Sequence, residues 1–244
     1  MLAIGSYSDI KTREIDPRLW LFFGVVAAAI YMNRLGESDL ILYTLFSLLA
    51  PLVVLLLVLL GFMGYADFFA FLVLVFLMPK PLDHDMIIPP AILILLLSDL
   101  ILLIYTLPMI MLNARYHRFI RDRCGSLTKS LLIILTGYPM NIKKYLNSRF
   151  MYPLIYPIKE GSNIKWICRS TYDIAEEIED YKTRFKNLVT EEPSLENQLI
   201  IVSWGAPYVL FVFLGVVIYP FTAFYIEELF RLLSKSIFIL LHSI

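Results

Sequence analysis

Twenty-one consecutive residues without a charge, Leu40 to Leu60, constrain this chain more than any other feature of its sequence. At about 1.5 Å per residue, a helix of this length crosses the hydrocarbon core of a bilayer, which is about 30 Å thick. Pro51 lies inside the run and is expected to kink the helix. Because several more long apolar runs follow, the chain is predicted to be a multi-span membrane protein.

The overall composition supports this class of protein and argues against others. Of the 244 residues, 59% are hydrophobic and 17% are charged, whereas soluble domains are about half apolar and about a quarter charged. The formal net charge is zero, so charge predicts no nucleic acid partner. Cys124 and Cys168 form no CxxC pair that could hold zinc, and we expect ordinary thiols if the polar region around them is cytoplasmic.

About six transmembrane helices are expected from the apolar runs. Residues 1–8 are interpreted as the end of a helix whose beginning is missing, and they count as the first. The remaining predicted spans are 19–32, 40–60, 67–78, 87–112 and 199–219. The segment after Phe221 is amphipathic, and it is expected to be either an interfacial helix or a continuation of the last span.

A polar region interrupts these spans. Residues 113–198 hold fourteen of the 21 Lys and Arg residues together with ten acids. The patterns inside it predict a short helix at 128–137, a β-hairpin with strands at 149–158 and 163–169, and an amphipathic helix at 171–189. The predicted fold is therefore an all-α membrane core at 1–112, a small α+β domain at 113–198, and a last transmembrane helix with an amphipathic tail at 199–244.

The distribution of basic residues predicts the orientation in the membrane. Loop 9–18 carries three Lys or Arg residues, whereas loops 33–39 and 79–86 carry one each. If the spans alternate, loops 9–18 and 61–66 and the domain 113–198 share one side, and the positive charge makes that side cytoplasmic. The protein is thus expected to be a multi-pass cell-membrane protein with that domain in the cytoplasm.

Two acids are predicted to meet this cytoplasmic face. Asp67 stands behind Gly61 and Gly64 and is followed directly by the apolar run Phe68 to Met78. A carboxylate at the edge of such a helix is costly, which makes it a candidate functional site. Asp9 follows the first apolar segment, and a helical bundle could place the two carboxylates side by side.

Two close carboxylates cannot both be ionised at low cost, so one of them keeps a proton near neutral pH. Such a pair could activate a water molecule and protonate a leaving amine, which is the chemistry of peptide-bond hydrolysis. Gly61 and Gly64 would let a substrate backbone approach. The alternative is that Asp9 is a solvated loop acid and that Asp67 is a helix N-terminal charge favoured by the helix dipole.

The two motifs together resemble those of the prepilin and preflagellin peptidases, which are membrane-embedded aspartic proteases of the glycine-x-glycine-aspartate class. The resemblance rests on Asp9-x-Lys11-x-Arg13-x-Ile15 and on Gly64-Tyr65-Ala66-Asp67, and it covers about residues 1–112. It implies that Asp9 and Asp67 are the catalytic aspartates. Ala66 stands where the family pattern has its second glycine, a small-residue departure that is similar to the archaeal branch.

The resemblance also implies a substrate. Family members cut the short basic leader of preflagellin or type IV pilin-like precursors, just before an apolar helix and at the cytoplasmic face. Glu14 and Asp16 could then attract the basic residues of the leader, although pairing with lipid headgroups or with neighbouring charges is an equal alternative. Because the chain has no CxxC pair, we expect cleavage without N-methylation, with no metal and no cofactor.

Several other readings remain open from the sequence. The chain could be a small ion- or proton-coupled transporter or a membrane assembly scaffold, with Asp67 and Asp99 as ion or proton ligands. Asp99 could otherwise bond Ser98 or a neighbouring helix. The residues Asp83-His84-Asp85 are interpreted as a solvated turn rather than a metal site. The arginines from Arg115 to Arg123 predict a basic strip facing anionic lipid. No oligomeric state is predicted.

Overall fold

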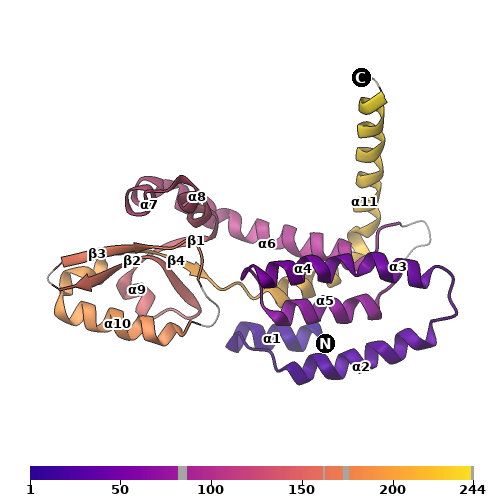
Figure 1. Cartoon of the computed structure of the whole chain (residues 1–244), viewed down its shortest axis with the longest axis horizontal. Helices are drawn as coiled ribbons and strands as arrows, with labels where there is room; N and C mark the ends of the chain where they lie inside the picture. Colours follow the sequence, from indigo (N-terminus) through magenta and orange to yellow (C-terminus); the bar gives the residue numbers. More distant parts are fainter. Residues whose placement is uncertain (82–86, 162, 173–175, 243–244) are drawn as a thin grey trace. The chain divides into compact units, whose positions relative to one another are not determined.

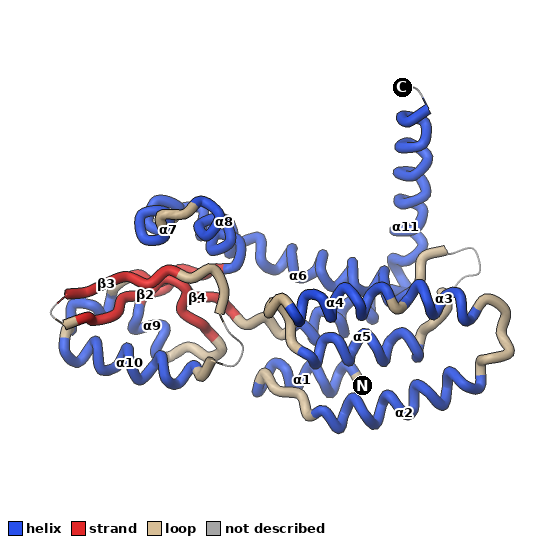
Figure 2. Tube along the Cα trace, viewed as in Figure 1, coloured by secondary structure: helices blue, strands red, loops and turns tan. Residues whose placement is uncertain are grey.

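The structure, a computed structural model, describes residues 1–81, 87–161, 163–172 and 176–242. The chain divides into two compact units. The first unit is made of Met1–Leu102 and Pro207–Ile244, and the second is made of Leu103–Ala206. Figures 1 and 2 show that the described part of the first unit is helical, whereas the second contains a β-sheet. The protein is therefore mostly helical with one small sheet domain.

A central helix organises the first unit. Helix α5 (Tyr65–Leu77) packs against α2, α3, α4 and α11, and α1 packs against α11 (Figure 1). The other helices of this unit are α1 (Leu2–Thr12), α2 (Pro17–Asn33), α3 (Leu40–Ser47), α4 (Leu49–Leu59), the first half of α6 (Pro90–Arg115) and α11 (Tyr208–His242). The candidate acid Asp67 thus lies in the first turn of the helix with the most neighbours.

Local sequence explains where these helices begin and break. The side chain of Asp16 accepts a hydrogen bond from the backbone N–H of Arg18 at 2.9 Å, and Pro17 takes the first helical position of α2, where its missing N–H costs nothing. The run 40–60 is interrupted at Leu48, between α3 and α4. Pro51 cannot bond the carbonyl four residues earlier, but Leu48 keeps helical backbone angles and the bonds from Leu48 to Thr44 and from Leu52 to Leu48 continue the helix. The predicted kink therefore stays a prediction.

Among the described residues, the core of the first unit consists of apolar side chains from α1, α2, α4, α5, α6 and α11. Each fully buried side chain of this size stabilises the fold by about 1.5–3 kcal/mol. Those with 0% exposure include Val54, Phe71, Val75, Leu93, Ile94 and Val212. Helices α6 and α11 approach closely at Gly215, where an added Cβ would lie 2.6 Å from Ser98 Oγ.

Among the described residues, three segments are long and apolar enough to cross a bilayer, as judged by length and composition. They are Leu40–Leu59, Pro90–Arg115 and Tyr208–Leu232. Three shorter apolar helices, Pro17–Asn33, Tyr65–Leu77 and Leu127–Thr136, fall below that length. The three long segments support a membrane protein, and the count of six spans stays a prediction.

The second unit is a four-stranded antiparallel sheet with a helical layer on each face. Its strand order is β1-β4-β2-β3. The strands are β1 (Gly137–Asn141), β2 (Met151–Glu160), β3 (Asn163–Cys168) and β4 (Leu199–Trp204). Helices α7 (His117–Cys124) and α8 (Leu127–Thr136) cover one face, and α9 (Ile142–Leu146) and α10 (Ile178–Glu191) cover the other (Figure 2).

The prediction that the last transmembrane helix begins at Leu199 is wrong. Residues Leu199–Trp204 form β4, and α11 begins only at Tyr208. The strand lies in the middle of the sheet, so Ile200 and Val202 pack against one helical layer while Ile201 packs against the other. A strand buried on both faces is a short continuous apolar run, which periodicity cannot distinguish from a helix. The tail continues α11 to His242, as one of the two alternatives for it predicted.

Other predictions for this region hold with shifted boundaries. The hairpin is confirmed, since β2 and β3 pair antiparallel from Ile155 with Cys168 to Glu160 with Asn163. The short helix predicted at 128–137 is α8. The amphipathic helix begins at Ile178 rather than at Thr171. Residues 173–175, which include the predicted helical position Ile174, lie outside the described residues.

The expectation of two ordinary thiols is also wrong, because Cys124 and Cys168 form a disulfide. Their Cα atoms are 5.3 Å apart, within the usual range for this bond. Cys124 ends α7 and Cys168 ends β3, so the bond ties the α7–α8 layer to the edge of the sheet. The two cysteines are 44 residues apart in sequence, so no local pattern could predict that they pair.

Candidate active site

The N-terminal end of α5 presents Asp67. Its carboxylate Oδ2 accepts a hydrogen bond from the backbone N–H of Gly64 at 3.0 Å, and the residue is only 7% exposed. This is one half of a capping box, in which an acid at the third helical position bonds back to the residue before the helix. Asp67 thus stands at a helix start, as the alternative reading had it, but its carboxyl group is buried rather than solvated.

The small residues before Asp67 have different reasons to be small. Gly61 has a φ of +78°, a conformation that favours glycine, and it makes the reversal between α4 and α5. A Cβ on Gly64 would meet no atom within 4 Å except Asp67 Oδ2, at 3.7 Å. Glycine at position 64 therefore keeps the space beside the carboxylate open. Ala66 packs against the apolar core.

Asp9 is held by the opposite end of the chain. It lies in the last part of α1 and is 9% exposed. Its Oδ2 accepts a hydrogen bond from the backbone N–H of Val209 at 3.2 Å. Ser6, one turn earlier, donates its hydroxyl to the carbonyl of the same Val209 at 3.1 Å. These two bonds fix α1 on the first turn of α11, so the alternative reading of Asp9 as a solvated loop acid is wrong.

Asp9 and Asp67 both lie in the first unit. The carboxyl group of Asp9 contributes to the electrostatic environment of Asp67, although burial is the larger effect there. A third charge, the guanidinium of Arg13, lies with its Nη1 atom 3.9 Å from Asp9 Oδ1. The site therefore combines two largely buried carboxylates with one cation beside the first of them.

Asp99 joins this region through a residue that sequence reasoning missed. The hydroxyl of Tyr208 donates a hydrogen bond to Asp99 Oδ1 at 2.6 Å, and Tyr208 also interacts electrostatically with Asp67. Ser98 instead donates to the carbonyl of Ile94, so Asp99 bonds a neighbouring helix rather than Ser98. The first two residues of α11 thus bond two of the acids, Tyr208 to Asp99 and Val209 to Asp9.

The sequence carried a partial signal for Tyr208 and Ser6. Tyr208 is the first helical residue after Pro207, where a phenol at the start of an apolar helix is positioned like a polar anchor. Ser6 lies three residues before Asp9 and thus on the same face of α1. What neither pattern could reveal is the partner, which lies about 200 residues away along the chain.

The two acids predicted to attract a basic leader occupy other positions. Glu14 is exposed, and its carbonyl accepts a hydrogen bond from the Thr12 hydroxyl at 3.0 Å. Asp16 is exposed as well, and its side chain caps α2. Asp16 therefore has a structural role, and contact of either residue with a substrate stays a prediction.

Metal ligation finds no support in the described part of the chain. Within those residues, no group of three or more His, Cys, Asp or Glu side chains could hold an ion. The residues Asp83-His84-Asp85 lie outside the described residues. The hydrogen bonds recorded for the carboxylates of Asp9 and Asp67 come from backbone N–H groups.

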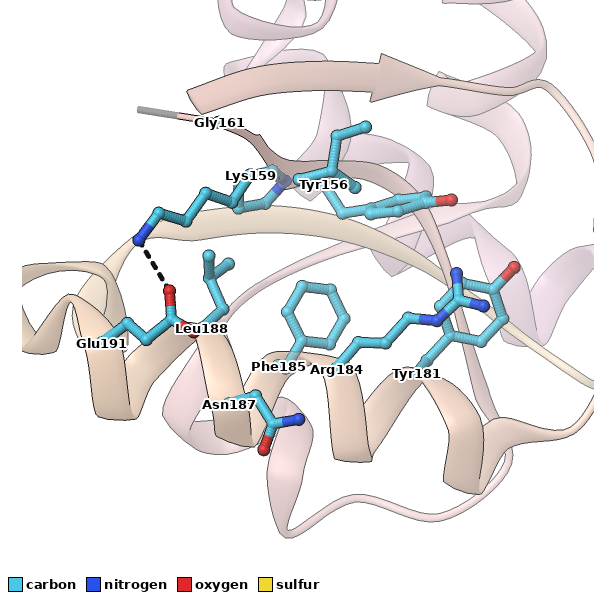
Figure 3. A pocket seen from close by; sticks show the side chains of 11 residues that line it. Tyr156, Lys159, Gly161, Tyr181, Arg184, Phe185, Asn187, Leu188 and Glu191 are labelled. Carbon is cyan, nitrogen blue, oxygen red and sulfur yellow. Dashed lines mark hydrogen bonds and ion pairs between the residues drawn. The ribbon is translucent and has the colours of Figure 1, made fainter. Parts of the chain in front are cut away.

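A groove of about 650 Å³ lies in the second unit, between β2 and α10 (Figure 3). Aromatic side chains, Tyr156, Tyr181 and Phe185, form much of its wall. Burial, reinforced by a hydrogen bond with Glu176, raises the pKa of Tyr181 to about 12. The acid of the groove, Glu191, is paired with Lys159 at 2.6 Å. The groove therefore offers no pair of carboxylates comparable with Asp9 and Asp67.

Comparison with known protein families gives two matches. The model of the type IV leader peptidase family matches residues 1–107. The model of the archaeal peptidase A24 C-terminus, type II, matches residues 129–222. The first match includes both Asp9 and Asp67, and the second includes the sheet and the start of α11. No curated protein and no solved structure gives a significant match.

Proposed function

Because the chain belongs to the prepilin and preflagellin peptidase-like family, we propose that it is a membrane-embedded aspartic endopeptidase. Its substrates are preflagellin or type IV pilin-like precursors, from which it removes the short basic leader. The observation that carries this proposal is the buried pair of interacting carboxylates, Asp9 and Asp67. The family match at the C-terminal region favours the archaeal branch.

Peptide hydrolysis by this pair requires one carboxylate to take a proton from water and the other to give a proton to the leaving amine. When two carboxylates meet around one water molecule, they share one proton, because ionising both is costly. Arg13 favours negative charge on Asp9, since it lies 3.9 Å from that carboxylate. We therefore assign the base role to Asp9 and the proton to Asp67.

Backbone groups hold each acid in place for this reaction. The N–H of Val209 bonds Asp9 Oδ2, and the N–H of Gly64 bonds Asp67 Oδ2. No hydrogen bond from the described residues reaches Asp67 Oδ1, which leaves that oxygen for a water molecule or for the scissile amide. The open space at Gly64 gives an extended substrate backbone a path to Asp67.

We also propose an orientation for the protein in the membrane. The basic residues of loop 9–18 and of residues 113–198 support a cytoplasmic position for the active site and for the sheet domain. The disulfide between Cys124 and Cys168 fits that side only in a cytoplasm that permits disulfides, as in hyperthermophiles. A precursor leader that is still in the cytoplasm would meet Asp9 and Asp67 from that side. We also propose that the protein crosses the membrane several times and cleaves without N-methylation.

The test is cleavage of a precursor by the full chain in membranes or detergent. The substrate carries a short basic leader before an apolar helix, and mass spectrometry locates the cut. The proposal expects one cut at the junction of leader and helix by the wild type and none by Asp67→Asn. If the wild type inserts normally but leaves every such precursor intact, the peptidase proposal fails. The result would then favour a transporter or a membrane assembly scaffold.

A further inference from the structure

The second unit carries an apolar surface that none of its described residues covers. Four leucines of α8, which we call the leucine face, are exposed: Leu127 by 65%, Leu131 by 60%, Leu132 by 36% and Leu135 by 52%. Leu127, Leu131 and Leu135 follow at four-residue steps and so form one stripe along the helix. The opposite side of α8 packs on the sheet through Ile133, which is fully buried. The helix is therefore apolar on both its inner and its outer side.

Chain connectivity holds this face near the end of a membrane helix. Helix α6 ends at Arg115, only Tyr116 separates it from α7, and only residues 125–126 separate α7 from α8. Eight residues of α7 span about 12 Å, so the start of α8 lies close to the point where α6 leaves the bilayer. The second half of α6 is itself apolar and exposed, with Ile104 exposed by 59% and Met111 by 71%.

A buried side chain ties the other end of α8 to the same point. The amide nitrogen of Asn113 donates a hydrogen bond to the carbonyl of Ile134 at 3.1 Å and another to the carbonyl of Gly137. Asn113 is 0% exposed and lies in the last turn of α6. Both ends of α8 are therefore tied to the end of α6, one through the short helix α7 and the other through Asn113. If α6 leaves the bilayer at its last turn, α8 lies at the level of the bilayer surface.

The charges beside the leucine face match lipid headgroups. Arg118 and Arg121 are exposed on one side of α7, and no ion pair to either is formed within the described part of the chain. Arg123 differs from them, because its guanidinium stacks over Trp166 at 4.3 Å. Basic residues next to an exposed apolar stripe are the composition of helices that lie in a membrane interface.

We propose that α7 and α8 form an interfacial anchor, in which the leucine face is immersed in the bilayer surface and Arg118 and Arg121 contact lipid phosphates. The anchor ties the sheet domain to the membrane at a point other than α6 and α11. The disulfide between Cys124 and Cys168 links the end of α7 to β3, so the anchor and the sheet are coupled. This inference does not depend on peptidase activity.

Spin-label accessibility in the full chain tests the anchor. Because no free cysteine is present among the described residues, Leu131→Cys or Leu135→Cys provides a single labelling site. Thr183→Cys, on the exposed side of α10, is the matched control. Each labelled protein is placed in nanodiscs of phosphatidylcholine and phosphatidylglycerol, and the collision rates of the nitroxide with oxygen and with a water-soluble nickel complex are measured.

The anchor predicts that the oxygen-to-nickel ratio at positions 131 and 135 is several-fold higher than at position 183. Equal ratios at all three positions would overturn it, because the leucine face would then be in water. Low collision rates with both reagents would also overturn it, since protein, such as a second copy of the chain, would then cover the face.

A double variant, Arg118→Glu with Arg121→Glu, should lower the oxygen-to-nickel ratio at position 131, whereas Lys186→Glu on α10 should not. An unchanged ratio in the arginine double variant would refute the phosphate contacts.

Discussion

The carboxylate of Asp9 accepts a hydrogen bond from the backbone N–H of Val209 at 3.2 Å, although the two residues are 200 positions apart. The first turn of a helix carries free N–H groups and a positive dipole end, both of which favour a negative charge. The last helix of the chain thus completes a site whose two acids come from its first third.

Arg13 should set the acidic limit of activity. Its Nη1 atom lies 3.9 Å from Asp9 Oδ1 and favours the negative charge that the proposed base needs. In Arg13→Gln, Asp9 loses this support, so the acidic limb of the pH–rate profile should move to higher pH. Arg13→Lys keeps the positive charge and should leave the profile close to that of the wild type. A profile that is identical in all three proteins would contradict the assignment of Asp9 as base.

Tyr208 should act by positioning the site rather than by chemistry. Tyr208→Phe removes the hydrogen bond to Asp99, which is worth about 0.5–1.5 kcal/mol, and loosens the turn that presents Val209 to Asp9. We expect a several-fold lower kcat with little change in KM. Tyr225→Phe, at a tyrosine of the same helix that is 73% exposed, is the control and should behave like the wild type.

Asp99→Asn tests whether Asp99 only holds Tyr208 in place or also transfers a proton in the reaction. The amide oxygen of asparagine can still accept the Tyr208 hydroxyl, so the variant should keep most of the activity. Steady-state kinetics of precursor cleavage is the measurement. Complete loss of activity in Asp99→Asn would show instead that Asp99 takes part in the chemistry as a third acid.

Gly64 should matter for the substrate more than for the fold. A Cβ at this position meets only Asp67 Oδ2, at 3.7 Å, so Gly64→Ala should leave the thermal midpoint within about 2 °C of that of the wild type. KM for the precursor should rise, because the methyl group occupies the proposed path of the substrate backbone. Gly36→Ala, where no atom lies within 4 Å of the added Cβ, is the control. An unchanged KM in Gly64→Ala would argue against approach from this side.

The disulfide should stabilise the sheet domain. Closing a loop of 44 residues is expected to stabilise the folded state by about 2–4 kcal/mol. Unfolding followed by tryptophan fluorescence should shift to lower temperature in Cys124→Ser, and by a similar amount in Cys168→Ser. A reducing agent should lower the midpoint of the wild type but not those of the variants. A midpoint insensitive to reduction in all three proteins would show that the bond contributes nothing to stability.

The sequence predicted the parts of this molecule that depend on local chemistry. The reversal at Gly61 and the start of α5 near Asp67 both follow from backbone preferences of the residues themselves. The hairpin of β2 and β3 was predictable for the same reason, because its strands flank a turn signal at Glu160–Gly161. In each case the cause lies within a few residues of the effect.

The missed features depend on contacts between distant segments. β4 has a continuous apolar pattern because both its faces are buried, and a single-sequence pattern cannot reveal the second helical layer. The bond between Cys124 and Cys168 needs the pairing of α7 with the sheet edge. Tyr208 and Ser6 gain their importance only because α11 returns to α1. Tertiary structure, not local propensity, selects all of these partners.

The most direct test of the central claim compares Asp9→Asn and Asp67→Asn, each alone, for cleavage of a basic-leader precursor. Asparagine keeps the size and polarity of the side chain but cannot exchange the proton. Asp39→Asn is the control, because Asp39 is exposed and has a φ of 60° that asparagine tolerates. The account predicts that both dyad variants insert into the membrane and fail to cleave, while Asp39→Asn cleaves normally. Normal cleavage by either Asp9→Asn or Asp67→Asn would contradict the two-aspartate site.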